Sequence, residues 1–158
     1  KIDIGMRYQG MVSDMARMKI IGIGAPEMVR LKTTTEEALL AGLSTLRDGS
    51  SLEEYAEAVE AVAKAAGYSC VRDLVGHGVG RELHEEPQIP NYLGSGLPSF
   101  RFAAGMTVAL EPMVNVGVHQ VRLADDGWTF VTADGKLSAH AENTVLITAD
   151  GYEILTTI

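Results

Sequence analysis

The stretch KIDIGMRYQGMVSDMARMKII (residues 1–21) decides how the fold begins. Its two alternating runs, KIDIGMRY and MVSDMARMKII, are separated by Gln9-Gly10, a pair that suits a tight hairpin turn. With the turn at this place, Asp3 pairs near residue 16, so Asp14 is its diagonal neighbour on the same face. The stretch therefore predicts a two-stranded hairpin within residues 1–23 that brings two carboxylates within reach of a shared cation.

Two helices are predicted after this hairpin. Between Pro26 and Leu46 apolar residues recur mostly at three- and four-residue steps, and proline suits the first turn of a helix. Ser51 and Glu54 then form a capping box for a second helix, which continues to Gly67 at its C-terminal end. The capping box makes this second helix the most clearly marked element in the sequence.

Short β-type runs punctuated by turns occupy the rest of the chain. The runs cover residues 68–75, 106–114, 119–123, 128–132, 140–148 and 152–156. The segments ADDGW, TADGK and TADGY are expected to be hairpin turns. This order predicts an α+β fold in one domain, residues 1–158, with helices backing one curved and mainly antiparallel sheet.

Composition narrows the possible partners. A net charge of −8 and the absence of a Lys/Arg cluster argue against nucleic acid, and the same excess of acid suits a cation site. No apolar run approaches the roughly 20 residues that span a bilayer. Cys70 is the only cysteine, which fits a buried side chain in a reducing, cytoplasmic setting. Because the sequence starts at Lys1 with a strand-like pattern, we expect it to be part of a longer protein.

The stretch GHGVGRELHEEP (residues 76–87) contains two histidines that we expect to have different roles. Its glycines disfavour a helix, so His77 and His84 do not share one helical face. Glycine on both sides of His77 permits close approach of another group, as at the end of a ligand-bearing strand. A solvated surface turn is the alternative.

Four carboxylates in otherwise apolar strands favour a ligand-binding role for His77 over a surface turn. They are Asp3, Asp14, Glu111 and Glu142. Each could lie alone at an exposed strand edge. Burying all four together would be prohibitive without cations, because each charge opposes ionisation of the next. Together with His77 they form a donor set that fits two Mn(II), Fe(II), Co(II) or Zn(II) ions. Two such ions roughly 3.5–4 Å apart activate a bridging water as hydroxide, which is hydrolytic chemistry.

Three ordered segments carry a resemblance to a known family: GHGVGRELHEEPQIPNY, GMTVALEPMVN and DGWTFVTADGKLSAHAENTVLITADGYEILT. In order and spacing the chain resembles the M24 metallopeptidases with their pita-bread fold, and among them the bacterial type I methionine aminopeptidases. The resemblance spans nearly the whole chain and corresponds to the C-terminal portion of the catalytic domain, without the family's N-terminal part and its further active-site histidine.

The resemblance implies a role for each site residue. Asp14 and Glu142 would bridge both ions, Asp3 would bind one ion, and His77 and Glu111 would bind the other. Glu111 would also transfer the proton of the bridging water. His84 would hydrogen-bond the substrate carbonyl or the developing oxyanion, and Trp128 would form a wall of the methionine pocket.

The implied activity is the removal of initiator methionine from the N-terminal peptide of nascent proteins, in the cytoplasm and in association with the ribosome. The complete protein would be a monomer that binds neither DNA nor membrane, and residues 1–158 alone would be weakly active at best. Two departures from the family pattern bear on the substrate: Leu83 replaces a usual aromatic residue, and Asn143 replaces a common histidine. An Xaa-Pro aminopeptidase or dipeptidase of the same fold and a non-catalytic M24-type binding module are the alternatives.

Overall fold

The N-terminal hairpin forms with the predicted turn and register. The structure, a computed structural model that describes residues 1–157, pairs β1 (Ile2–Tyr8) antiparallel with β2 (Met11–Arg17). Gln9 and Gly10 both have positive φ, 49° and 84°, as a tight two-residue turn requires. The second strand ends at Arg17 rather than continuing to residue 21, because the chain leaves the sheet there and Ile21 is 88% exposed.

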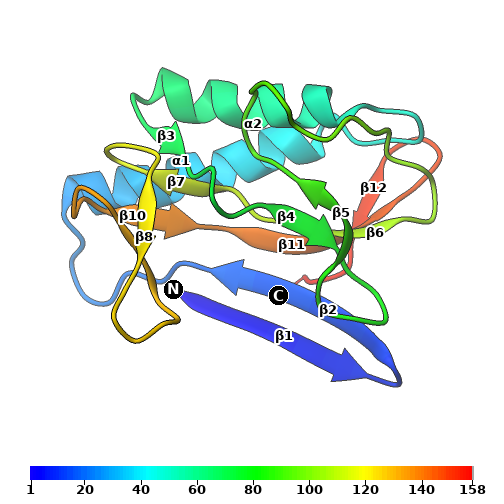
Figure 1. The fold of residues 1–158 in the computed structure, drawn as a ribbon, viewed down its shortest axis with the longest axis horizontal. Coiled ribbons are helices and arrows are strands. Elements are labelled where there is room, and N and C mark those ends of the chain that lie inside the picture. The colour runs from blue at the N-terminus through cyan, green and yellow to red at the C-terminus, as the bar shows by residue number, and fades with distance from the viewer. Residues whose placement is uncertain (158) are drawn as a thin grey trace.

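Both predicted helices are present. Helix α1 (Pro26–Leu43) begins at the proline but stops three residues before Leu46, where the chain continues in tighter turns. Helix α2 (Leu52–Ala65) has the full capping box, with Ser51 accepting from Glu54 N and the Glu54 carboxylate accepting from Ser51 N. The two helices pack on each other above the large sheet (Figure 1).

Twelve strands are described, and all of their pairings are antiparallel. Seven form a large sheet in the order β1-β2-β11-β6-β4-β5, with β12 also paired to β11. A three-stranded sheet has the order β10-β7-β3, and β8 pairs with β9 alone. The remaining bounds are β3 (Ser69–Cys70), β4 (Gly76–Gly78), β5 (Glu85–Ile89), β6 (Thr107–Leu110), β7 (Met113–Asn115), β8 (Val121–Leu123), β9 (Phe130–Thr132), β10 (Ser138–His140), β11 (Glu142–Ile147) and β12 (Tyr152–Ile154).

The α+β class is confirmed, but the strands divide into three sheets instead of one. Strands β4 and β5 were not predicted, because glycine and charged residues hide their pattern. The predicted run 106–114 breaks at Glu111-Pro112, since proline cannot donate to a ladder and β7 turns into the smaller sheet. ADDGW and TADGY connect paired strands as expected, whereas TADGK leads from β9 to β10, which belong to different sheets.

The large sheet has two chemically different faces. Val108 and Val145 are paired neighbours on the face that joins the helices in the hydrophobic core, together with Leu110 and Ile147. Residues an odd number of positions away along each strand point the opposite way, and they include Ala109 of β6 and Glu142 of β11. The functional side chains gather on this second face. Within residues 1–157, neither helix is long and apolar enough to cross a membrane.

Candidate metal centre

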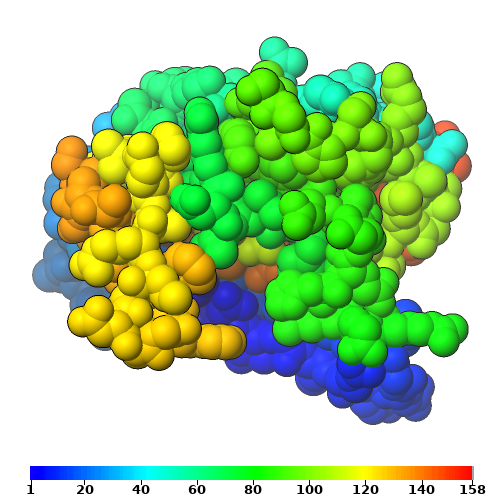
Figure 2. All heavy atoms as spheres, viewed as in Figure 1, coloured from blue at the N-terminus to red at the C-terminus, as the bar shows by residue number. Residues whose placement is uncertain are grey.

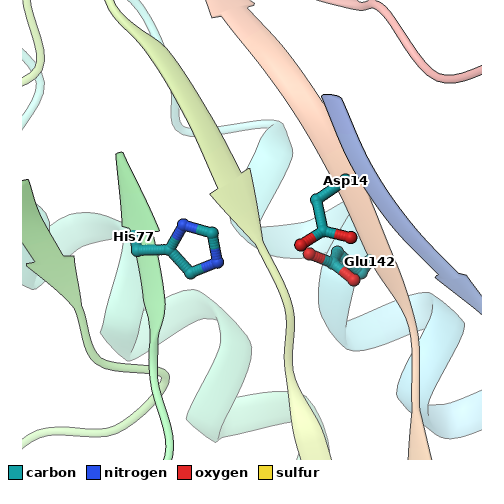
Figure 3. A group of neighbouring side chains, drawn as sticks. All are labelled: Asp14, His77 and Glu142. Carbon is teal, nitrogen blue, oxygen red and sulfur yellow. The ribbon is translucent and has the colours of Figure 1, made fainter. Parts of the chain in front are cut away.

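Three residues from three separate strands converge on the face opposite the helices: Asp14, His77 and Glu142. Each offers a ligand atom, these atoms lie within 4.8 Å of one another, and all three residues are buried. Figure 3 shows the His77 ring pointing across β6 toward the two facing carboxylates. The register explains the convergence, because His77 lies opposite Ala109 of β6, while Glu142 lies opposite Ala16 of β2. The small alanine side chains leave room for the longer ligands.

The glycines beside His77 are needed for close strand packing. A Cβ on Gly76 would lie 2.5 Å from the carbonyl oxygen of Ala109, and one on Gly78 would collide with the carbonyl oxygen of Glu86. His77 Nδ1 lies 2.8 Å from the carbonyl oxygen of Gly78, which turns Nε2 toward the site. The expected close approach at these glycines is thus confirmed.

Glu111 joins the group from the break between β6 and β7. Its side chain is 12% exposed, and Oε1 lies 3.4 Å from His77 Nε2. Pro112 directs the chain into the smaller sheet immediately afterwards, so that Glu111 stays at the end of β6 beside β4. The sharp change of direction places this carboxylate over the centre.

Asp3 lies at the outer side of the cluster. Its side chain is 37% exposed and its Oδ2 is 3.0 Å from Lys1 Nζ. Asp3 lies opposite Ala16 and Asp14 lies opposite Gly5, so the two carboxylates share one face of the hairpin, as predicted. The Asp3 charge is near enough to raise the pKa of Asp14. The structure therefore brings all five predicted ligand residues to one place, with Asp3 nearest to solvent.

His140 is a further site residue that the sequence reasoning did not single out. Its side chain is 6% exposed, and Nε2 lies 3.3 Å from Glu111 Oε2 and 4.0 Å from Glu142 Oε2. Its Nδ1 lies 3.8 Å from Asp3 Oδ2. The sequence carried no local signal for it, because His140 belongs to β10 and reaches the site through the pairing of that strand with β7.

The electrostatics of the cluster favour bound cations. Burial, followed by the charges of Glu111, Asp14 and Asp3, raises the pKa of Glu142 to about 9. Burial and the neighbouring Asp3 also raise the pKa of Asp14. A cation among these oxygens would offset the repulsion that causes both shifts.

An unsatisfied atom supports the same conclusion. Among the described residues, Asp14 Oδ1 is a buried carboxylate oxygen at this site without a hydrogen-bond partner. Buried polar atoms normally have partners, and hard carboxylate oxygens with an imidazole are the donors that first-row divalent metals bind. The residues present therefore fit a divalent metal centre.

His84 and Trp128 lie outside the buried cluster. His84 is exposed, and its ring centroid is 4.4 Å from that of His77 at an interplanar angle of 62°. Trp128 lies in the turn between β8 and β9 and is 85% exposed, so it is not a core residue. Figure 2 shows a hollow between the yellow β8–β9 hairpin and the green loop between β4 and β5, with blue and orange atoms at its floor. His84 and Trp128 belong to the two segments that border this hollow.

Two further residues of the segments that carry the family resemblance, Glu85 and Asn143, have structural contacts. Glu85 Oε1 accepts hydrogen bonds from the backbone N–H groups of Arg81 and Glu82, and so fixes the loop that carries His84. Asn143 points to the face opposite the metal ligands, where its amide donates to the hydroxyl and carbonyl oxygens of Thr156. Its amide therefore takes no part in the cluster of predicted metal ligands.

Fold and site together define a class: an α+β protein with a carboxylate-rich metal centre on an antiparallel sheet. The model of metallopeptidase family M24 matches residues 1–149. The chain belongs to metallopeptidase family M24, and its fold is the pita-bread fold of that family.

Within this family, the chain is similar to several methionine aminopeptidases. The chain is 45% identical over 157 residues to a methionine aminopeptidase of Clostridium perfringens, covering 99% of this chain and 63% of the relative. It is 41% identical to methionine aminopeptidase 1 of Bacillus subtilis, with the same coverage of both chains. The solved methionine aminopeptidase of Thermotoga maritima superposes with a TM-score of 0.93 at 42% identity, over 99% of this chain and 62% of that one. The chain thus spans about three fifths of the length of these relatives.

A prolidase from Pyrococcus furiosus shares the fold alone, with a TM-score of 0.76 at 24% identity over 99% of this chain and 40% of that one.

Proposed function

We propose that the protein containing this chain is a metal-dependent methionine aminopeptidase that removes initiator methionine from nascent polypeptides. The observation that carries the proposal is the buried convergence of Asp14, His77 and Glu142, with Glu111 beside them. The names of relatives at 40–45% identity support methionine as the residue removed.

The donor set supports two divalent ions, drawn from Mn(II), Fe(II), Co(II) and Zn(II). Asp3, Asp14, His77, Glu111 and Glu142 would hold these ions. When bound, such ions supply Lewis acidity and lower the pKa of water enough to provide a nucleophile near neutral pH.

The chain's own residues would divide the remaining tasks. Glu111, close to His77 and only 12% exposed, would accept the proton of the attacking water and later give it to the departing amine. His84, held by the loop that Glu85 fixes, would donate to the carbonyl oxygen of the scissile peptide as negative charge develops there. Trp128 would border the side-chain pocket for methionine from the β8–β9 hairpin.

We further propose that the substrate is the N-terminal peptide of a nascent protein, met in the cytoplasm and near the ribosome, and that the complete protein works as a monomer. The net charge of −8 supports a partner other than DNA. The hollow between the β8–β9 hairpin and the loop between β4 and β5 is the place where we expect the peptide to enter.

Cleavage of a Met-Ala-Ser peptide by the complete protein, loaded with Mn(II) or Co(II), tests this function. We expect release of free methionine, measured by chromatography. Untouched Met-Ala-Ser with cleavage of an Xaa-Pro peptide would instead select the Xaa-Pro peptidase alternative. Absence of both hydrolysis and bound metal would select the non-catalytic module.

Ligand variants test the centre separately from the substrate. His77→Ala and Glu142→Ala should each lower the metal content measured by elemental analysis after gel filtration. His84→Ala is the matched control. It also removes an imidazole, whose ring centroid is 4.4 Å from that of His77, but we expect His84 to contact the substrate and not the metal. It should keep its metal and lose activity, by about 100- to 1,000-fold in kcat if it stabilises the oxyanion.

A further inference from the structure

We propose that His140 is a positioning residue of Glu111: its Nε2–H holds Oε2 of the Glu111 carboxylate while Oε1 of the same carboxylate faces His77. The inference rests on the metal centre of the proposed function and adds a residue to it. It is carried by the burial of His140, by its orientation between the acidic groups and by the unpartnered state of its inner nitrogen.

His140 is fixed by the smaller sheet rather than by the sheet that carries the other site residues. It ends β10, where it pairs with Met113 of β7, two residues after Glu111. The side chain is 6% exposed and Nε2 lies 3.3 Å from Glu111 Oε2. Among the described residues, Nε2 is a buried nitrogen without a hydrogen bond of good geometry. A small rotation of the Glu111 carboxylate would supply that hydrogen bond.

The outer nitrogen of His140 indicates where the ring carries its hydrogen. Nδ1 lies 3.1 Å from Lys1 Nζ, which is also 3.0 Å from Asp3 Oδ2. A lysine ammonium group only donates hydrogen bonds, so Nδ1 is the acceptor and the ring hydrogen is on Nε2. A nitrogen that carries hydrogen does not bind metal, which makes His140 a donor to Glu111 rather than a sixth ligand.

Each carboxylate oxygen of Glu111 therefore has an imidazole ring beside it. His77 Nε2 is 3.4 Å from Oε1, and His140 Nε2 is 3.3 Å from Oε2. A carboxylate that both holds a metal and moves a proton must keep one orientation, and a hydrogen-bond donor behind a ligand supplies that constraint. His140 therefore acts on the reaction through Glu111 and does not contact the substrate.

Nitrogen NMR of the complete protein, labelled with 15N-histidine and loaded with diamagnetic Zn(II), tests the hydrogen position directly. We expect the Nε2–H form for His140, with a proton signal that moves upfield in Glu111→Ala, where the acceptor is gone. An Nδ1–H form with a metal-bound Nε2 would overturn the proposal. This result does not depend on peptide cleavage, so it remains decisive if the aminopeptidase function fails.

Two substitutions test the consequence for the site. His140→Gln keeps an N–H donor, whereas His140→Leu removes it, and both are compared by thermal unfolding to show that they fold. With Co(II) as the probe, His140→Leu should change the visible absorption spectrum and lower kcat by about 10- to 100-fold with little change in KM. His140→Gln should largely restore both. Equal behaviour of the two variants, either both impaired or both like the natural protein, would contradict the role of the donor.

Discussion

Glu142 is the residue whose charge is least compatible with its surroundings when no cation is present. It is 2% exposed and has Glu111, Asp14 and Asp3 as charged neighbours, which together with burial raise its pKa from 4.5 to about 9. At a pH between these two pKa values, Glu142 keeps its proton in the folded metal-free protein but has lost it in the unfolded chain. This contribution to stability is therefore complete below about pH 4.5 and is lost as the pH rises toward 9.

The expected slope is a decrease in the free energy of unfolding of up to about 1.4 kcal/mol per pH unit in that range. Urea denaturation of metal-free protein at pH 5 to 8 measures it, with Glu142→Gln as the reference that cannot ionise. The difference between the two proteins should favour Glu142 at pH 5 and the glutamine variant at pH 8. A difference that does not change with pH would contradict the assigned charge state.

Cys70 illustrates burial without function. The thiol is buried in the core, and burial raises its pKa to about 12. Because the thiolate is the reactive form, its fraction at pH 8 is roughly 1,000-fold below that of an unperturbed cysteine. We expect iodoacetamide to label Cys70 rapidly in urea and hardly at all in the native protein, as measured by mass spectrometry. Rapid labelling of the native protein would mean that the strand β3 opens easily.

Residue type and local pattern alone were enough to select side chains that the structure places close together. Carboxylates in apolar strands and a histidine between glycines identified Asp3, Asp14, His77, Glu111 and Glu142, which the structure brings together, and their binding of metal stays a prediction. His140 could not be selected in the same way, because a lone histidine is common in a strand. Its importance arises from the pairing of β10 with β7, a long-range contact that no local pattern records.

At the scale of the element, the cap of α2 is the interaction with the clearest local cause. Ser51→Ala removes the side-chain acceptor for Glu54 N and should lower the free energy of unfolding by about 1 kcal/mol. Ser44→Ala is the matched control, since Ser44 is an exposed serine at the end of α1 and should change stability by less than about 0.5 kcal/mol. Equal losses in the two variants, measured by chemical denaturation, would show that the capping box has no special contribution.

Elements with local signals were predictable, and those defined by long-range pairing were not. The hairpin turn at Gln9-Gly10 and the capping box of α2 depend on neighbours in sequence, and both were predicted correctly. Strand β4 consists of Gly76, His77 and Gly78, residues with weak strand preference, and exists because β5 and β6 pair with it on both sides. The division into three sheets has the same origin, because the chain breaks at Pro112 and at Ala141 and consecutive strands there pair in different sheets.

At the scale of the whole molecule, the hairpin of β1 and β2 has an apolar face that the two helices do not cover. Alternation along β1 places Ile2, Ile4 and Met6 on the face away from Asp3, and each is at least 58% exposed. Two apolar hollows on this face are lined by Met6, Ser13 and Leu155 among others. Within residues 1–157, no strand pairs with the outer edge of β1. A surface of this kind marks a contact site.

The length comparison suggests what covers that surface. The chain spans 63% of a relative that it matches over nearly all its own length, and we predict that the remaining part of the complete protein packs against β1 and β2. Residues 1–158 alone should therefore bind the apolar dye ANS strongly and cleave Met-Ala-Ser peptides weakly or not at all, whereas the complete protein should bind less dye. Ile4→Glu with Met6→Glu should reduce dye binding by the short chain, because both side chains contribute to the exposed face.

Leu40→Glu provides the control for that experiment, since Leu40 is 57% exposed on α1, away from the hairpin. It should leave most of the dye signal in place, and all variants should be compared by circular dichroism so that unfolding is not mistaken for binding. Full activity of residues 1–158 without dye binding would contradict the prediction. The reason for expecting the opposite is structural: Asp3 lies on β1, an edge strand with no partner on its outer side among residues 1–157, so covering the apolar face would also fix the most exposed of the predicted metal ligands.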